Sequence, residues 1–219
     1  MDGEPRMGDR RKLGVLALTV VALTVPQFAV AGPPASEVTV RDDSFAPTQP
    51  APLNFGGSFS WKRAPGAVDE HNVHQVAGLF KSGNPTKTSF TAAHPYSITP
   101  SAGSYTYFCD AHRALGMVGK IKVRPIVEPG TLGSRSFGVQ WASPTNKETG
   151  TRFDVRYQVG GKWKPWKNDT ASFHGTFGKH RRPVRVKPRH TYKVEVRSEQ
   201  QNTSKKSDWS PALPVKTSG

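Results

Sequence analysis

Short runs in which every second residue is β-branched or aromatic recur along this chain, and they limit its fold more than any other feature. Such alternation is typical of strands that bury one face. Clusters of glycine, proline, asparagine and serine separate the runs, and the chain holds 21 glycines and 19 prolines. The alternating positions are Val38/Val40, Phe59/Trp61, Tyr105/Tyr107, Val118 with Ile121/Val123, Phe137/Val139/Trp141, Phe153/Val155/Tyr157 and Tyr192/Val194/Val196. The sequence shows no sustained 3.6-residue period with helix caps, so we predict an all-β chain of antiparallel sandwiches.

The first 31 residues are predicted to be a secretory signal peptide. Basic residues precede an uncharged apolar run at 13–25, and the small residues at 29–31 fit a cleavage site. The run is shorter than the ~20 residues that span a bilayer, although retention as an uncleaved anchor stays open. The pair Arg10-Arg11 also admits a twin-arginine route, but its surroundings favour the general route. We therefore expect a secreted mature chain without a transmembrane span, in the periplasm or at the cell surface.

Charge divides the remaining chain into two parts. Residues 32–125 hold 9 Lys+Arg and 6 Asp+Glu, a net charge of +3, whereas residues 126–219 hold 18 and 7, a net charge of +11. Two prolines and a glycine at 125–130 end one strand-rich run before the next begins. We predict a signal peptide at 1–31 and two domains at 32–125 and 126–219.

The only cysteine lies in a cluster of residues that can bind metal. Cys109 is followed by His112 and Met117, and His71 and His74 lie upstream. Two imidazoles, one thiolate and a weak axial thioether make up the blue-copper ligand set. Ligation also explains an unpaired thiol in an exported chain. Since residues 71 and 74 face opposite sides of a regular strand, only one of these histidines can point at the cysteine loop.

The same stretches resemble a known family. The run His71-Asn72-Val73, the run Tyr107-Phe108-Cys109 and the spacing Cys-x2-His-x4-Met resemble the plastocyanin/amicyanin branch of the cupredoxins over residues 36–124. The resemblance implies an eight-strand Greek-key barrel that holds one type 1 copper ion. It selects His71, Cys109 and His112 as strong ligands and Met117 as the axial ligand. It also implies that Asn72 bonds across to the cysteine loop, whereas His74 lies near the surface.

A filled ligand set predicts an electron carrier rather than an enzyme, because no coordination position remains for a substrate. We expect single-electron transfer between redox partner proteins. The docking surface is predicted around His112, from Ala111, Arg113, Ala114, Leu115 and Gly116. The alternative is a non-redox copper-binding or cell-surface interaction protein in which the same fold stores or senses the metal.

The second part resembles a fibronectin type III domain over residues 128–217. Trp141, Tyr157, the run at 186–194 and the run at 207–211 carry this resemblance. It implies that Trp141 packs in the core and that Tyr192 is a corner tyrosine whose hydroxyl bonds back to the chain. No catalytic grouping is evident in this part of the sequence.

Residues 179–189 are strongly basic. If they form a strand, Arg181, Arg185, Lys187 and Arg189 share one face. That stripe is either a solvated surface or a docking and adhesion site for an anionic cell-surface polymer such as teichoic acid, acidic polysaccharide or lipid headgroups. Export argues against nucleic acid as the physiological partner, and the copper-protein resemblance with a short signal favours a bacterial source.

Overall fold

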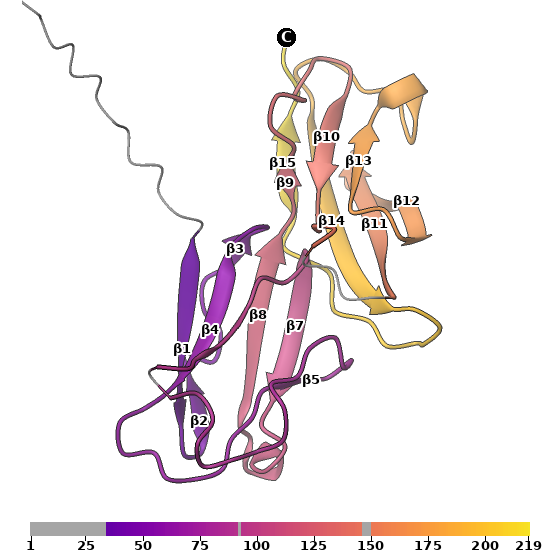
Figure 1. Ribbon diagram of the computed structural model, residues 1–219. Coiled ribbons are helices and arrows are strands. Elements are labelled where there is room, and N and C mark those ends of the chain that lie inside the picture. Colours follow the sequence, from indigo (N-terminus) through magenta and orange to yellow (C-terminus); the bar gives the residue numbers. More distant parts are fainter. Residues whose placement is uncertain (1–33, 92, 146–149) are drawn as a thin grey trace, which may run out of the picture. The chain divides into compact units, whose positions relative to one another are not determined.

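The computed structural model describes residues 34–91, 93–145 and 150–219, and there it is built from strands (Figure 1). The only helical elements in these ranges are two 3₁₀ turns, η1 (Arg113–Leu115) and η2 (Lys179–Arg181). The all-β prediction is therefore confirmed. The predicted signal peptide at 1–31 lies outside the described residues.

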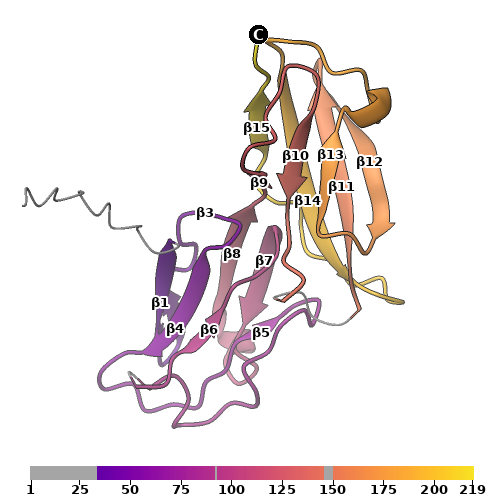
Figure 2. The ribbon, with the colours of Figure 1, turned by 45° about the horizontal axis from the view of Figure 1, so that its top comes forward.

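The first eight strands form two four-stranded sheets. One sheet has the order β2-β1-β4-β6 and the other has the order β3-β8-β7-β5. Figures 1 and 2 both show β1 beside β4 and β7 beside β8. The pairs β1/β4 and β3/β8 are parallel, and the other pairs are antiparallel. The bounds are β1 (Ala35–Arg41), β2 (Ser44–Ala46), β3 (Leu53–Asn54), β4 (Ser58–Arg63), β5 (His74–Gln75), β6 (Tyr96–Ile98), β7 (Gly103–Phe108) and β8 (Val118–Arg124).

The alternating residues of these strands fill one buried cluster, as predicted, with a single exception. Val38, Val40, Phe59, Trp61, Tyr105, Tyr107, Ile121 and Val123 are all buried in it. Val118 is instead 39% exposed. Because side chains alternate between faces along a strand, Val118 lies opposite to Ile121, and Gly119 takes the inward position. A Cβ atom at Gly119 would lie 2.3 Å from the ring of Tyr107, so only glycine leaves room for that ring.

The remaining strands form a second sandwich with a three-stranded sheet, β13-β10-β9, and a four-stranded sheet, β12-β11-β14-β15. The sequence did not predict β12, which contains Pro165 and shows no alternation of buried residues. Proline is tolerated there because β12 is an edge strand, where a missing N–H breaks no interior ladder. The bounds are β9 (Ile126–Val127), β10 (Phe137–Gln140), β11 (Thr151–Val159), β12 (Lys162–Thr170), β13 (His174–Phe177), β14 (Thr191–Gln200) and β15 (Leu213–Lys216).

Trp141 and Tyr192 take the positions predicted for them. Trp141 is fully buried, and its indole N–H donates to the carbonyl of Ser172 at 2.8 Å. The hydroxyl oxygen of Tyr192 accepts a hydrogen bond from the backbone N–H of Lys187 at 2.9 Å. This bond from a buried ring to the chain five residues upstream is a tyrosine corner.

Removing the Tyr192 hydroxyl is expected to destabilise the second sandwich. Tyr192→Phe should lower the free energy of unfolding by about 1–2 kcal/mol, because the Lys187 N–H loses its acceptor in a partly buried position. Urea denaturation followed by tryptophan fluorescence measures this change. Tyr157→Phe is the control, since Tyr157 is also buried in this sandwich but its hydroxyl makes no hydrogen bond within the described ranges. Equal losses in the two variants would contradict the prediction.

The basic run does not form a strand. Residues 182–190 are irregular, and η2 precedes them. Pro183 and Pro188 cannot donate to a sheet ladder. His180, Arg181 and Arg189 have positive φ values of 53°, 64° and 58°, which no extended strand accommodates. The condition under which Arg181, Arg185, Lys187 and Arg189 would share one face of a strand is therefore not met.

The described residues, 34–91, 93–145 and 150–219, belong to one compact unit. Two separate hydrophobic clusters lie within it, one for each sandwich. The expected boundary between residues 125 and 126 stays a prediction. In the described ranges, no helix has the length and apolar character needed to cross a bilayer.

Candidate metal centre

The loop that joins β7 to β8 brings Cys109 and His112 together. Phe108 pairs with Val118 at the end of the hairpin, and Cys109 is the first residue of the loop. Its N–H donates to the carbonyl of Met117, while the N–H of Met117 donates to the carbonyl of His112, each at 3.2 Å. Gly116 has a φ of +86°, which glycine adopts without steric cost and which turns the chain toward β8. Local hydrogen bonds therefore fix the loop's conformation.

His71 reaches the same place from a distant part of the chain. Its backbone N–H and carbonyl each bond to Thr86 at 3.2 Å, and the hydroxyl of Ser89 donates to the His71 carbonyl at 2.6 Å. The imidazole is fully buried. This frame places the ring against the cysteine loop although 38 residues separate His71 from Cys109.

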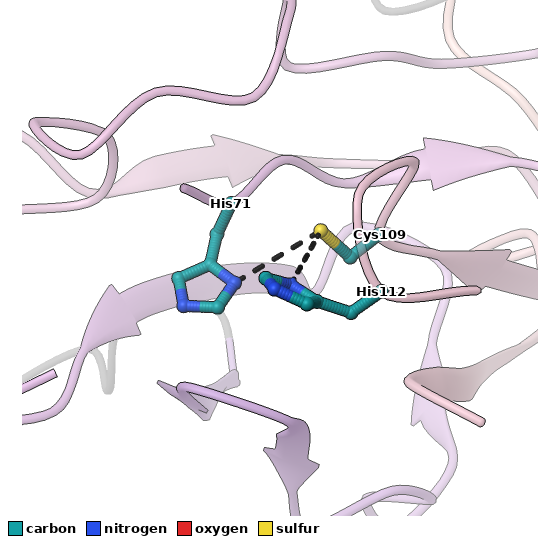
Figure 3. A group of neighbouring side chains, drawn as sticks. All are labelled: His71, Cys109 and His112. Atoms are coloured by element: carbon teal, nitrogen blue, oxygen red, sulfur yellow. Dashed lines mark hydrogen bonds between the residues drawn. The ribbon is translucent and has the colours of Figure 1, made fainter. Parts of the chain in front are cut away.

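Three side chains converge with the geometry of a metal site. The Cys109 Sγ atom lies 3.9 Å from Nδ1 of His71 and 3.6 Å from Nδ1 of His112 (Figure 3). Bonds of about 2.3 Å to sulfur and about 2.0 Å to imidazole, as in zinc sites, would separate these donors by roughly 3.5–3.8 Å. The three donor atoms therefore surround a space of the right size for one ion.

Met117 lies in the interior beside this group. Its side chain is fully buried and belongs to the same hydrophobic cluster as Cys109. Two imidazoles, one thiolate and one thioether form the soft donor set that is typical of type 1 copper. The residues present thus fit copper, and the predicted cofactor agrees with the site.

Asn72 fixes the start of the loop, as the resemblance implied. Its Oδ1 accepts from the N–H of Asp110 at 2.8 Å, and its amide donates to the Asp110 carboxylate at 2.7 Å and to the Gly83 carbonyl at 2.8 Å. His74 points elsewhere, because its Nδ1 lies 2.9 Å from the Asp110 carboxylate. Burial raises the pKa of Asp110, but hydrogen bonds from His74, Asn72 and Lys81 outweigh it and lower that pKa to about 2. His74 is thus a partner of the loop and lies outside the donor cluster.

Two carboxylates that the sequence analysis did not identify face the outer nitrogens of the imidazoles. Asp42 Oδ1 lies 3.7 Å from Nε2 of His71, a buried nitrogen that makes no hydrogen bond with the described residues. Asp69 Oδ2 lies 3.9 Å from Nε2 of His112. Asp42 also accepts from the backbone N–H groups of Val68 and Asp69 at 2.8 and 3.1 Å, so it holds the loop that carries Asp69.

The protonation state of His71 favours ligation, because the ring stays neutral. Burial, together with the positive charges of Arg63 and His112, lowers the pKa of His71, while Asp42 acts in the opposite direction. A lowered pKa keeps the imidazole neutral at neutral pH, and a neutral imidazole has a free lone pair for a metal. The Arg63 side chain is itself fixed by hydrogen bonds to the carbonyls of Ser89, Ala67, Asp69 and Thr86.

His112 is the member of the donor cluster that reaches solvent. Its side chain is 14% exposed, whereas those of His71 and Cys109 are fully buried. The residues of the predicted docking patch, Ala111, Arg113, Ala114, Leu115 and Gly116, are all exposed beside it. Leu115 is 68% exposed, and the Arg113 guanidinium lies 4.3 Å above the ring of Phe108.

Comparison with known proteins agrees with this site. Residues 53–124 match the family model of copper binding proteins of the plastocyanin/azurin family. A plastocyanin from Nostoc punctiforme is 31% identical over 128 residues, which cover 50% of this chain and 91% of that protein.

Solved structures of two kinds are also similar. A mutant fern plastocyanin is 18% identical and covers 40% of this chain and 98% of its own, with a TM-score of 0.29. The fibronectin type III domain of human fibronectin type III domain containing protein 3 is 20% identical and covers 43% of this chain and 81% of its own, with a TM-score of 0.32.

Proposed function

Since the chain belongs to the plastocyanin/azurin family of copper-binding proteins, we propose that it carries single electrons between redox partners outside the cytoplasm. The observation that carries this proposal is the convergence of Cys109 Sγ with one ring nitrogen from each of His71 and His112. His71, Cys109 and His112 would hold the copper ion through two imidazole nitrogens and one thiolate, and Met117 would add its thioether sulfur. The signal peptide at 1–31 and a docking role for residues 126–219 belong to the same proposal.

Bound copper supplies a one-electron change between its two oxidation states. The chain's own residues keep the site rigid during that change. Hydrogen bonds of Asn72 and of the 109–117 backbone hold the loop in one conformation. Burial of His71, Cys109 and Met117 excludes water. A carrier is favoured over an enzyme, because four protein ligands leave no coordination position for a substrate.

The electron is proposed to leave through the exposed edge of His112. Cys109 and His71 are sealed from solvent, so a partner can approach the donor cluster only where His112 reaches the surface. The exposed apolar side chain of Leu115 gives this surface a contact that can be desolvated when a partner docks.

Leu115→Glu is expected to slow electron transfer to the native partner by about tenfold, because a charge placed in an apolar contact costs binding energy. Stopped-flow kinetics measures the rate. The visible spectrum should not change, because Leu115 is exposed and contributes no donor atom. Leu132→Glu, a matched change at an exposed leucine outside the patch, is the control. An unchanged rate in Leu115→Glu would disprove the role of the patch.

The test of function is spectroscopic and electrochemical. The full chain loaded with one equivalent of Cu(II) should show an intense visible charge-transfer band and a reversible one-electron wave in voltammetry. A protein that only stores or senses the metal would bind copper without a reversible wave at a potential that respiratory partners can reach. That result would favour the alternative function over the carrier.

A further inference from the structure

Gly178 and the basic run at 179–189 fold around a hollow in the second sandwich. The hollow has a volume of about 440 Å³ and is lined by Arg135, Gly178, His180, Arg181, Arg185, Val186, Lys187 and Pro188. Of the lining residues, three are arginine, one is lysine and one is histidine, and none is acidic. A volume of this size is typical of sites that take up a ligand.

The positive charge of the hollow is not neutralised by the protein. Residues 178–189 contain six lysines and arginines and no aspartate or glutamate. In the described part of the chain, none of the basic side chains that line the hollow forms an ion pair. All five of them are exposed. Cations gathered without partners repel one another, and an anion from outside would relieve this repulsion.

The backbone beneath these charges is held in place at several points. Val186 is buried between the exposed residues Arg185 and Lys187. The N–H of Lys187 bonds to the Tyr192 hydroxyl, and its carbonyl accepts from the Thr217 hydroxyl at 2.8 Å. A loop that is fixed before binding loses little conformational entropy when it binds.

Gly178 brings the two sides of the hollow together. A Cβ atom at this position would lie 2.5 Å from a methyl group of Val186 and 2.6 Å from the carbonyl oxygen of Arg135. Only glycine permits this close approach, which brings Arg135 next to the basic loop. His180 and Arg181 then take left-handed conformations that side chains rarely adopt. A tightly packed segment with such residues is typical of functional sites.

We propose that this hollow binds the phosphate groups of an anionic polymer. Arginine presents a planar fork of donors that matches phosphate oxygens, and Arg135, Arg181 and Arg185 provide three such forks. A phosphate group accepts hydrogen bonds from several directions at once, whereas a carboxylate accepts them in one plane. A concave site whose donors point inward from several sides therefore suits phosphate better than carboxylate. Repeated phosphates would engage several of these cations together.

The experiment is calorimetric titration of the copper-loaded full chain with long-chain inorganic polyphosphate. We expect binding that weakens as salt is added. Arg185→Gln should weaken it about tenfold, the loss usual for one charge-assisted hydrogen bond. Arg189→Gln is the matched control, because Arg189 belongs to the same basic run but does not line the hollow. It should change the affinity less than twofold.

Three results would overturn the proposal. The first is that polyphosphate does not bind. The second is that Arg185→Gln and Arg189→Gln lose the same affinity for polyphosphate, and the third is that polyglutamate binds as tightly as polyphosphate. Equal losses would indicate unspecific attraction to the whole basic run, and tight polyglutamate binding would indicate a site for carboxylate polymers. The visible copper spectrum is recorded for each variant, so a failure here is distinguishable from a failure of the copper site.

Discussion

Cys109→Ser is expected to abolish the intense visible absorption of the copper-loaded protein. The band requires charge transfer from a thiolate to copper, and Cys109 is the only cysteine in the chain. A serine hydroxyl is a harder donor that does not select copper in the same way. Visible absorption and electron paramagnetic resonance of the variant, titrated with Cu(II), measure the loss.

His71→Ala and His74→Ala provide a matched pair for the same experiment. The first removes a nitrogen 3.9 Å from Cys109 Sγ and should also abolish the band. The second removes a ring that is bonded to Asp110 and should leave the band in place. Retention of the band in Cys109→Ser, or its loss in His74→Ala alone, would contradict the proposed ligands.

Asp154→Asn is expected to lower the free energy of unfolding by about 1–2 kcal/mol at neutral pH, because charge-assisted hydrogen bonds to a buried carboxylate are lost. Its buried carboxylate accepts from the side chains of Arg197 and Lys206 and from the backbone N–H of Asp169. The cations that remain, Arg197 and Lys206, are about one-third exposed, and Lys206 also pairs with Glu199, so water and Glu199 compensate for part of the loss. Urea denaturation at pH 7 measures the change.

The effect of Asp154 should depend on pH in a defined direction. Burial raises the pKa of Asp154, but the hydrogen bonds from Asp169, Arg197 and Lys206 outweigh it and lower that pKa below its usual value. The stabilisation of the folded state by the ionised Asp154 carboxylate is therefore complete above the pKa of an aspartate in the unfolded chain, about 3.9. It is lost as the pH falls through the lower pKa that Asp154 has in the folded state. The difference between wild type and variant should shrink at pH 3. Asp169→Asn, whose carboxylate is exposed, is the control and should change stability less.

The sequence predicted those parts of the fold and site that depend on local pattern. Alternation identified the strands that bury Phe59, Trp61, Tyr105 and Tyr107. The spacing from Cys109 to Met117 predicted one loop with three ligands, because a hairpin connection of that length must return to the same sheet end. His71 was identified through the family resemblance, since spacing alone left His74 open.

Features that depend on contacts between distant loops could not be predicted in the same way. Asp42 and Asp69 face the two imidazoles only because hydrogen bonds connect their loops. Residues 181–189 do not form the strand that would align their cations, because the prolines and the left-handed residues Arg181 and Arg189 interrupt it. The close packing of Gly178 against Val186 and the Arg135 carbonyl places Arg135 beside the basic run, and no pattern in the sequence indicates this.

The burial of His71, Cys109 and Met117 has a consequence for the binding and release of copper. Since His112 is the one member of the donor cluster that meets solvent, we expect copper to enter and leave beside His112, at the surface where a redox partner would dock. A partner protein bound beside His112 would also shield the copper ion from chelators. Slower removal of copper by a chelator would therefore detect the docked complex without an electrochemical measurement.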